Sequence, residues 1–157
     1  MNFSFLGGSA ARNLPPPPQA AAGLETGITG SIPLYTFDGA VLAEYLEPGD
    51  RIIARGRGSA LLRALHVVEH HSPMVRIAPT TLGRARPENF VLLPPDQRVV
   101  LRRAVGAPCD GIFAARALVD GENVKWHEPK RPVRLVHLVF DTPQIVHAGG
   151  LELEVGI

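Results

Sequence analysis

The chain has 157 residues, of which 45% are hydrophobic and 20% charged, and its formal net charge is +1. This length suits a single domain with a sizeable core, and so weak a net charge argues against nucleic acid as a partner. The single cysteine, Cys109, excludes an intrachain disulfide and a cysteine-rich metal site. We therefore predict no cofactor and no metal, and we interpret Cys109 as a loop thiol rather than a catalyst.

The first residues of the chain, MNFSFLGGSAARNL, have no basic stretch ahead of an apolar one. They therefore do not resemble a secretory signal, and no run approaches the roughly 18 apolar residues of a membrane span. We expect a cytoplasmic protein without a membrane partner.

A proline run follows in NLPPPPQAAAG, residues 13–23. Successive prolines lack amide donors and hold the backbone near polyproline II, so this segment suits neither a sheet nor a helix. We predict a flexible proline-rich arm over residues 1–25 and a β domain over residues 26–157.

From about residue 31 the pattern is that of short strands separated by Gly, Pro, Asp or Asn. The strand-like stretches are SIPLYTF, DRIIAR, MVRIA, NFVLL, RVVLRR, VRLVHLVF, QIVHA and LELEV. Residues 40–46 suit a helical turn or a strand, residues 111–121 suit a short helix that Gly121 stops, and residues 61–71 fit neither period cleanly. Asp50, after Pro48 and Gly49, is expected to bind backbone amides of its turn. The sequence predicts a single compact all-β domain of twisted antiparallel hairpins.

Three histidines, His66, His70 and His71, form the pattern H-x-x-x-H-H. On a helix His66 and His70 would share a face and begin a zinc site, but a third ligand is not apparent. On a strand they would stand about 13 Å apart, too far for one ion. We interpret all three as surface histidines.

The stretch TFDGAVLAEYLEPGDRI, residues 36–52, resembles the opening of the Hint domain, the self-processing module of inteins and hedgehog C-terminal regions. Its bacterial branch has a cysteine, about a dozen residues to Asp-Gly, and then L-x-P-G-D-x-V. Four further stretches follow in the same order: MVRIAPTTLG, VLLPPDQRVVL, ARALVDGENV and VHLVFDTPQIVHAGG. The resemblance implies a Hint fold over roughly residues 27–157.

The resemblance also implies a chemistry. In the family a cysteine thiol attacks the carbonyl of the preceding residue to give a thioester, and a histidine in a T/S-P-x-H pattern protonates the departing amide nitrogen. In this chain the cysteine position falls on Gly27 or, with one inserted residue, on Thr26, and the histidine position falls on Gln97. Glutamine does not transfer a proton near neutral pH. Of the later family motif only His137 remains, because Asp141-Thr142-Pro143 stands where D-x-H is common.

We therefore predict a vestigial site whose candidate residues are Thr26, Gly27, Ser31, Gln97 and His137. On this interpretation the domain has lost autoprocessing and serves as a binding or structural module, with a protein or peptide in the groove that once held the scissile bond. The alternative is a residual self-cleaving protein that uses the Thr26 or Ser31 hydroxyl in an N–O acyl shift. For His137 the competing interpretation is an ordinary core histidine.

Overall fold

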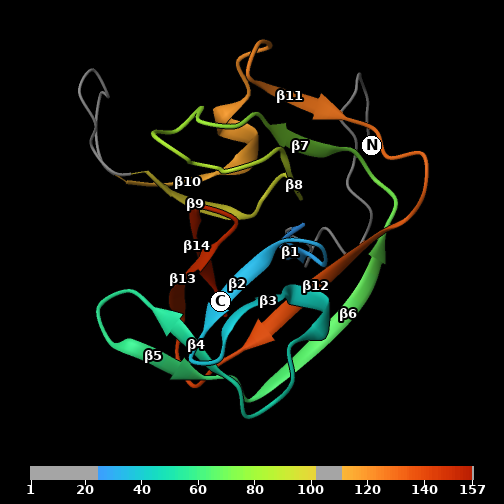
Figure 1. Ribbon diagram of the computed structural model, residues 1–157. Helices are drawn as coiled ribbons and strands as arrows, with labels where there is room; N and C mark the ends of the chain where they lie inside the picture. The colour runs from blue at the N-terminus through green and yellow to red at the C-terminus, as the bar shows by residue number, and fades with distance from the viewer. Residues whose placement is uncertain (1–24, 102–110, 157) are drawn as a thin grey trace.

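The computed structural model describes residues 25–101 and 111–156. The predicted arm, apart from Glu25, and Cys109 lie outside the described residues. Within them the regular secondary structure is antiparallel strands, apart from two short 3-10 helices (Figure 1). No helix in this part of the chain has the length and apolar character needed to cross a membrane.

The strands form three sheets. The first has the order β1-β12-β6 and is built from β1 (Ile28–Thr29), β12 (Val133–Val139) and β6 (Ala64–His70). The second has the order β11-β7-β8 and is built from β11 (Val124–His127), β7 (Met74–Ile77) and β8 (Val91–Leu93). In Figure 1 the second sheet lies at the top of the molecule and the first crosses its lower right.

The third and largest sheet has the order β10-β9-β14-β13-β2-β4-β5, with β3 paired to β2 off this path. Its strands are β10 (Gly111–Ala114), β9 (Arg98–Leu101), β14 (Leu151–Val155), β13 (Gln144–Ala148), β2 (Pro33–Thr36), β4 (Arg51–Ala54), β5 (Gly58–Leu61) and β3 (Gly39–Leu42). The last strand, β14, thus pairs with both β13 and β9, which brings the C-terminal end of the domain into the centre of this sheet.

Turn chemistry explains where several hairpins reverse. In the β2–β3 hairpin the Thr36 hydroxyl donates to the Gly39 carbonyl at 2.8 Å and accepts from the Asp38 amide at 3.0 Å. Gly39 has a φ of +105°, which L side chains disfavour. At the next turn the Asp50 carboxylate accepts from the Glu47 amide at 2.8 Å, which confirms the structural role predicted for Asp50.

The ambiguous segments are resolved by packing. Residues 40–46 contain both predicted structures, because β3 runs directly into a 3-10 helix over Ala43–Tyr45. Residues 61–71 contain the last residue of β5, Leu61, and the whole of β6, which pairs with β12 along all seven of its residues. This segment therefore passes from the third sheet to the first.

The helix predicted over residues 111–121 is wrong in its first half and in its stop. Gly111–Ala114 form strand β10 against β9, and only Ala115–Leu118 form a 3-10 helix. Gly121 lies beyond that helix, in the turn where Asp120 accepts three backbone amides. Sheet pairing overrode the local helical pattern here.

The core is one cluster of aliphatic side chains shared by the three sheets. Ile28, Leu34, Ile52, Leu93 and Leu153 in it are fully buried. Because β1 carries Ile28 into this cluster, burial fixes the position of the residues just before it, Glu25 to Gly27.

Candidate functional site

Residues 25–27 enter the domain between the start of β9 and the middle of β12. The Glu25 amide donates to the Asp96 carboxylate, Oδ2, at 2.9 Å, and the Asp96 amide donates to the Glu25 carbonyl at 2.9 Å. The other carboxylate oxygen of Asp96 forms an ion pair with Arg116 Nε at 2.9 Å. This pairing holds the segment in place one residue before the predicted site.

The peptide bond between Thr26 and Gly27 is bound by side chains at both of its polar groups. The Gly27 N–H donates to Gln97 Oε1 at 2.9 Å. The Thr26 carbonyl lies 2.6 Å from His137 Nε2, and because a carbonyl only accepts, His137 Nε2 carries the proton and donates. Four of the five candidate residues therefore meet at a single peptide group.

Gln97 is 2% exposed, and its side-chain amide is fully bonded. Its Nε2 donates to the Glu154 carbonyl at 2.9 Å and to the Arg98 carbonyl at 3.1 Å, while Oε1 accepts from Gly27. Two carbonyls on one side and an N–H on the other fix the orientation of the amide. Gln97 thus links the entry segment to β9 and β14.

Gly27 approaches His137 more closely than any other residue type would allow. Its φ is +134°, and a Cβ built on it would lie 3.1 Å from His137 Nε2 and 3.3 Å from Leu135 Cβ. Both the backbone conformation and the space therefore favour glycine. In this geometry residue 27, one of the two positions aligned with the family's nucleophile, has no side chain, and the space beside it is occupied by the imidazole.

His137 lies on β12 and is partly buried. The β6 partner directly opposite is His66, so the two imidazoles leave the sheet on the same face. His70, on the same face of β6, has a side chain only 11% exposed, with Nε2 3.4 Å from Glu25 Oε1. The surface position predicted for His70 is wrong, because residue 25 crosses over it, whereas His66 and His71 are exposed.

A cavity of about 500 Å³ opens beside this peptide. Its lining combines the entry segment with the end of the domain: Thr26, Gly27, Gln97, Arg98, Val136, His137, Leu138, Val139, Glu154, Val155 and Gly156. We call it the junction cavity. Arg98 and Glu154 form an ion pair across it at 2.6 Å, and the valine and leucine side chains supply the apolar part of its wall.

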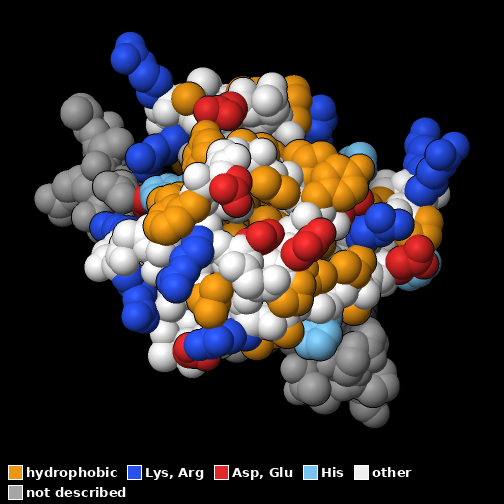
Figure 2. All heavy atoms as spheres, turned by 60° about the horizontal axis from the view of Figure 1, so that its bottom comes forward, with side chains coloured by type: hydrophobic (Ala, Val, Ile, Leu, Met, Phe, Trp, Pro, Cys, Tyr) orange, Lys and Arg blue, Asp and Glu red, His pale blue; other side chains and the backbone are white. Residues whose placement is uncertain are grey.

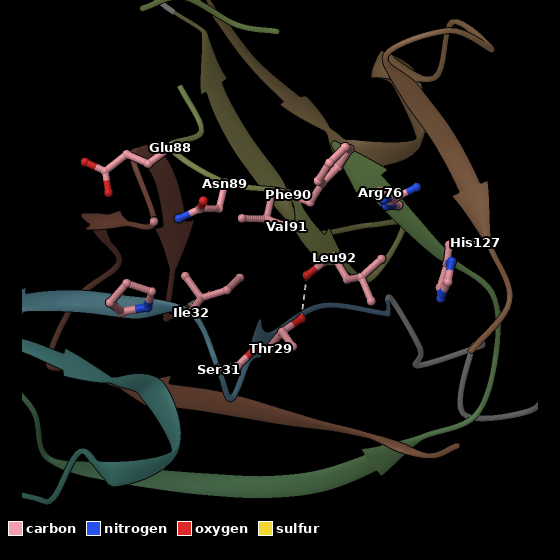
Figure 3. Close-up of a pocket in the computed structure, with 12 residues that line it drawn as sticks. Thr29, Ser31, Ile32, Arg76, Glu88, Asn89, Phe90, Val91, Leu92 and His127 are labelled. Atoms are coloured by element: carbon pink, nitrogen blue, oxygen red, sulfur yellow. Dashed lines mark hydrogen bonds between the residues drawn. The ribbon is translucent and has the colours of Figure 1, made fainter. Parts of the chain in front are cut away.

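Ser31 lies elsewhere. It lines a second cavity of about 350 Å³ between residues 29–33 and residues 88–92 (Figure 3), and this second cavity shares no lining residue with the junction cavity. The structure therefore brings Thr26, Gly27, Gln97 and His137 together and leaves Ser31 apart. Sequence reasoning missed Asp96 and Glu154, since only the folded chain shows that they hold Glu25 and Gln97.

Chemically, this arrangement polarises one carbonyl. The His137 N–H lies where negative charge would develop on the Thr26 oxygen during nucleophilic attack. Gln97 accepts the Gly27 N–H, but an amide has no proton to give to a departing amine near neutral pH. At residue 27 no hydroxyl or thiol is available.

Comparison with known proteins agrees with this architecture. The family model for the Hint domain matches residues 30–155. Among solved structures, a bacterial intein-like domain from Clostridium thermocellum has a TM-score of 0.62 at 16% identity, covering 86% of this chain and 100% of that one. A DnaB intein from Synechocystis sp. PCC 6803 has a TM-score of 0.57 at 15% identity, covering 83% and 99%.

No curated protein matches the sequence of this chain. The two structural likenesses concern the fold alone, because the identities are low. The family model spans most of the chain, including the hairpins that flank the junction cavity, and on that match the chain belongs to the Hint domain family.

Proposed function

We propose that this Hint domain does not process itself and serves as a binding or structural module, with the junction cavity as its contact surface. The observation that carries the proposal is the pair of residues at the Thr26–Gly27 peptide: a glycine where the family has its nucleophile, bonded to a glutamine where the family has its proton donor.

An acyl shift at this peptide requires a side-chain nucleophile on residue 27 and a proton for the departing nitrogen. Gly27 supplies no nucleophile and Gln97 supplies no proton. The remaining contribution, polarisation of the Thr26 carbonyl by His137, stabilises a charge that no attacking group creates. The peptide is consequently stable.

The two hydroxyls considered from the sequence have no base bonded to them: among the described residues neither the Thr26 nor the Ser31 hydroxyl forms a hydrogen bond to an imidazole or a carboxylate. Thr26 would attack the Glu25 carbonyl, which accepts the Asp96 amide, and Ser31 would attack the Gly30 carbonyl, which accepts the Glu44 amide at 3.1 Å. His137, the imidazole at the junction, bonds a different carbonyl. These contacts favour the inert interpretation over self-cleavage.

A binding role is supported by the shape and lining of the junction cavity. Val139 is 37% exposed on its wall, and Leu138 and Val155 lie beside it. Apolar walls with a charged pair at the rim suit an extended peptide that carries an apolar side chain. We infer that the partner is a protein or peptide segment of this kind.

Intact mass spectrometry tests the loss of processing. The full chain is incubated for days near neutral pH with and without dithiothreitol and hydroxylamine, beside the matched variants Thr26→Ala and Ser31→Ala. We expect one unchanged mass in every sample. A fragment that begins at residue 26 or 31, and that is absent from the corresponding alanine variant, would show residual self-cleavage instead.

The binding role is tested separately, with peptides selected from a random library against the full chain. We expect selected peptides to protect the amides of residues 136–139 and 153–156 from hydrogen exchange, and to lose affinity at least tenfold for Val139→Glu. Selection of no peptide, or protection confined to other strands, would overturn this role and leave the inertness of the junction intact.

A further inference from the structure

The second cavity, the one that Ser31 lines, is lined by a guanidinium and by polar side chains without a hydrogen-bond partner among the described residues. We propose that it binds an apolar carboxylate, with Arg76 as the residue that recognises the charge. This binding site is distinct from the junction cavity and from the function proposed for it.

The cavity lies where two sheets face each other without pairing. β1 and β8 are bridged there by the Thr29 hydroxyl, which donates to the Leu92 carbonyl (Figure 3). Ile32 and Val91 line the floor, and Phe90 forms part of the wall. A volume of about 350 Å³ suits a small ligand or the end of a peptide.

Two main-chain amides face this space. Gly30 donates to the Arg134 carbonyl in the ladder with β12, so its neighbour Thr29 directs its N–H to the opposite side, away from β12. Leu92 directs its carbonyl toward Thr29, so its N–H also points away from β7. In these registers neither N–H donates within its own two-strand ladder.

The polar side chains around the cavity are also unused. The side chains of Ser31, Asn89 and His127 make no hydrogen bond to any part of the chain that the structure describes. Their groups are donors or can act as donors. Each of these side chains can also accept, so the preference for an anion comes from the Arg76 guanidinium and the two main-chain amides, which only donate.

Arg76 supplies the positive charge. Its guanidinium carbon lies 3.9 Å from the centre of the Phe90 ring, a stacked arrangement that leaves the N–H edges free. Among the described residues no carboxylate lies within ion-pair distance of Arg76. A guanidinium held flat in this way is suited to bidentate recognition of a carboxylate.

One acidic residue, Glu88, also lines the cavity. Figure 3 shows Glu88 at the end opposite to Arg76 and His127, with Ile32 and Val91 between them. The ligand's carboxylate therefore belongs at the Arg76 end, and its apolar body lies over Ile32, Val91 and Leu92. The negative charge of Glu88 selects against a second acidic group on the ligand.

The test is a titration of the full chain followed by amide NMR, with phenylacetate as probe and phenylacetamide as its neutral isostere. We expect phenylacetate to shift the amides of residues 29–32, 76 and 90–92, and to bind at least tenfold more tightly than phenylacetamide. Equal binding of the two probes, or shifts confined to other residues, would overturn the proposal.

Three variants test which charged side chain recognises the carboxylate of the ligand. Arg76→Gln is expected to weaken phenylacetate binding at least tenfold, Glu88→Gln to strengthen it two- to fivefold, and Lys125→Gln, at the β11 position directly opposite Arg76, to change it less than twofold. If Arg76→Gln binds like the wild type while its melting curve is unchanged, the assignment of Arg76 is wrong.

Two further probes separate the sources of such a carboxylate. A dipeptide ending in phenylalanine is compared with its C-terminal amide. Stronger binding of the free-acid dipeptide than of phenylacetate would assign the site to peptide C-termini, and the reverse order would assign it to small free acids. Failure of both acids to bind would refute the site whatever the outcome at the junction.

Discussion

The junction cavity and the second cavity differ in how their polar groups are used. At the junction, Gln97 makes three hydrogen bonds within the chain, and His137 is committed to the Thr26 carbonyl. At the second cavity, Arg76 is stacked on Phe90, and the amides of Thr29 and Leu92 point away from their partner strands β12 and β7.

This difference in bonding affects two properties, the stability of the fold and the ability to bind a ligand. Polar groups that bond to each other hold the entry segment in place and are not free to bind another molecule. Polar groups without internal partners contribute little to folding but remain available for a charged ligand. The use of polar groups thus differs between the two places, whereas the face drawn in Figure 2 mixes hydrophobic and charged side chains.

The largest effect is expected from removing the bonded amide at the junction. Gln97→Met keeps the side chain's length but loses three hydrogen bonds, which lowers the free energy of unfolding by about 3 kcal/mol. Urea denaturation measures the change.

Gln144→Met is the matched control. Gln144 is also buried, at 6% exposure, but its amide donates only to Thr142, two residues away. We expect a loss of about 1 kcal/mol, because the exposed Thr142 groups can bond to water instead. Equal losses for the two variants would show that the junction network has no special role in stability.

The next effect concerns the close approach of Gly27 to His137. Gly27→Ala introduces a Cβ that crowds the imidazole at a φ that alanine disfavours, and we expect a loss of about 2 kcal/mol. The NMR signal of the His137 Nε2 proton should also change, because the bond to the Thr26 carbonyl lengthens.

Gly39→Ala separates backbone strain from crowding. Gly39 also has a positive φ, +105°, but nothing lies within 4 Å of a Cβ built there. A loss of about 1 kcal/mol is expected from strain alone. The contact with His137 is not tight if two results are obtained together. Gly39→Ala would lower the free energy of unfolding as much as Gly27→Ala, and the NMR signal of the His137 Nε2 proton would be unchanged in both variants.

At the second cavity, urea denaturation should show almost no change in the free energy of unfolding when the charged side chain is replaced. Arg76→Gln without ligand is expected to change the free energy of unfolding by no more than about 0.5 kcal/mol, because the stacked guanidinium has no ion-pair partner among the described residues and is exposed. A loss comparable to that of Gln97→Met would mean that Arg76 belongs to the folding network and would remove the contrast between the cavities.

The smallest effect is a pH dependence away from both cavities. The pKa of Asp120 lies below its ordinary value because the carboxylate accepts the amides of Val124, Glu122 and Asn123. A depressed folded pKa contributes stability above the unfolded pKa of about 3.9 and loses it as pH falls through the folded pKa. The difference in the free energy of unfolding between wild type and Asp120→Asn should therefore shrink as pH falls from 6 to 2. A constant difference would contradict the lowered pKa of Asp120 in the folded protein.

Much of the fold could be predicted from local pattern. Alternating aliphatic residues bounded by Gly, Pro and Asp give the strands, and the carboxylate of Asp50 gives its turn. The error over residues 111–121 arose where a helix-like stretch pairs with β9, a partner that local sequence does not reveal. At the site, the family pattern aligned Gln97 with the proton-donor position and either Gly27 or Thr26 with the nucleophile position, and the structure brings all three to one peptide.

The sequence by itself determined which chemical groups stand at the junction, because the absence of a side chain at Gly27 and of a titratable group at Gln97 does not depend on folding. Only the tertiary structure decided what those residues do. The bond from Gln97 to the Glu154 carbonyl joins residues 57 positions apart, and that from His137 to Thr26 joins residues 111 apart. Such contacts follow from strand order and register, and the second cavity likewise exists only because β1 and β8 face each other without pairing.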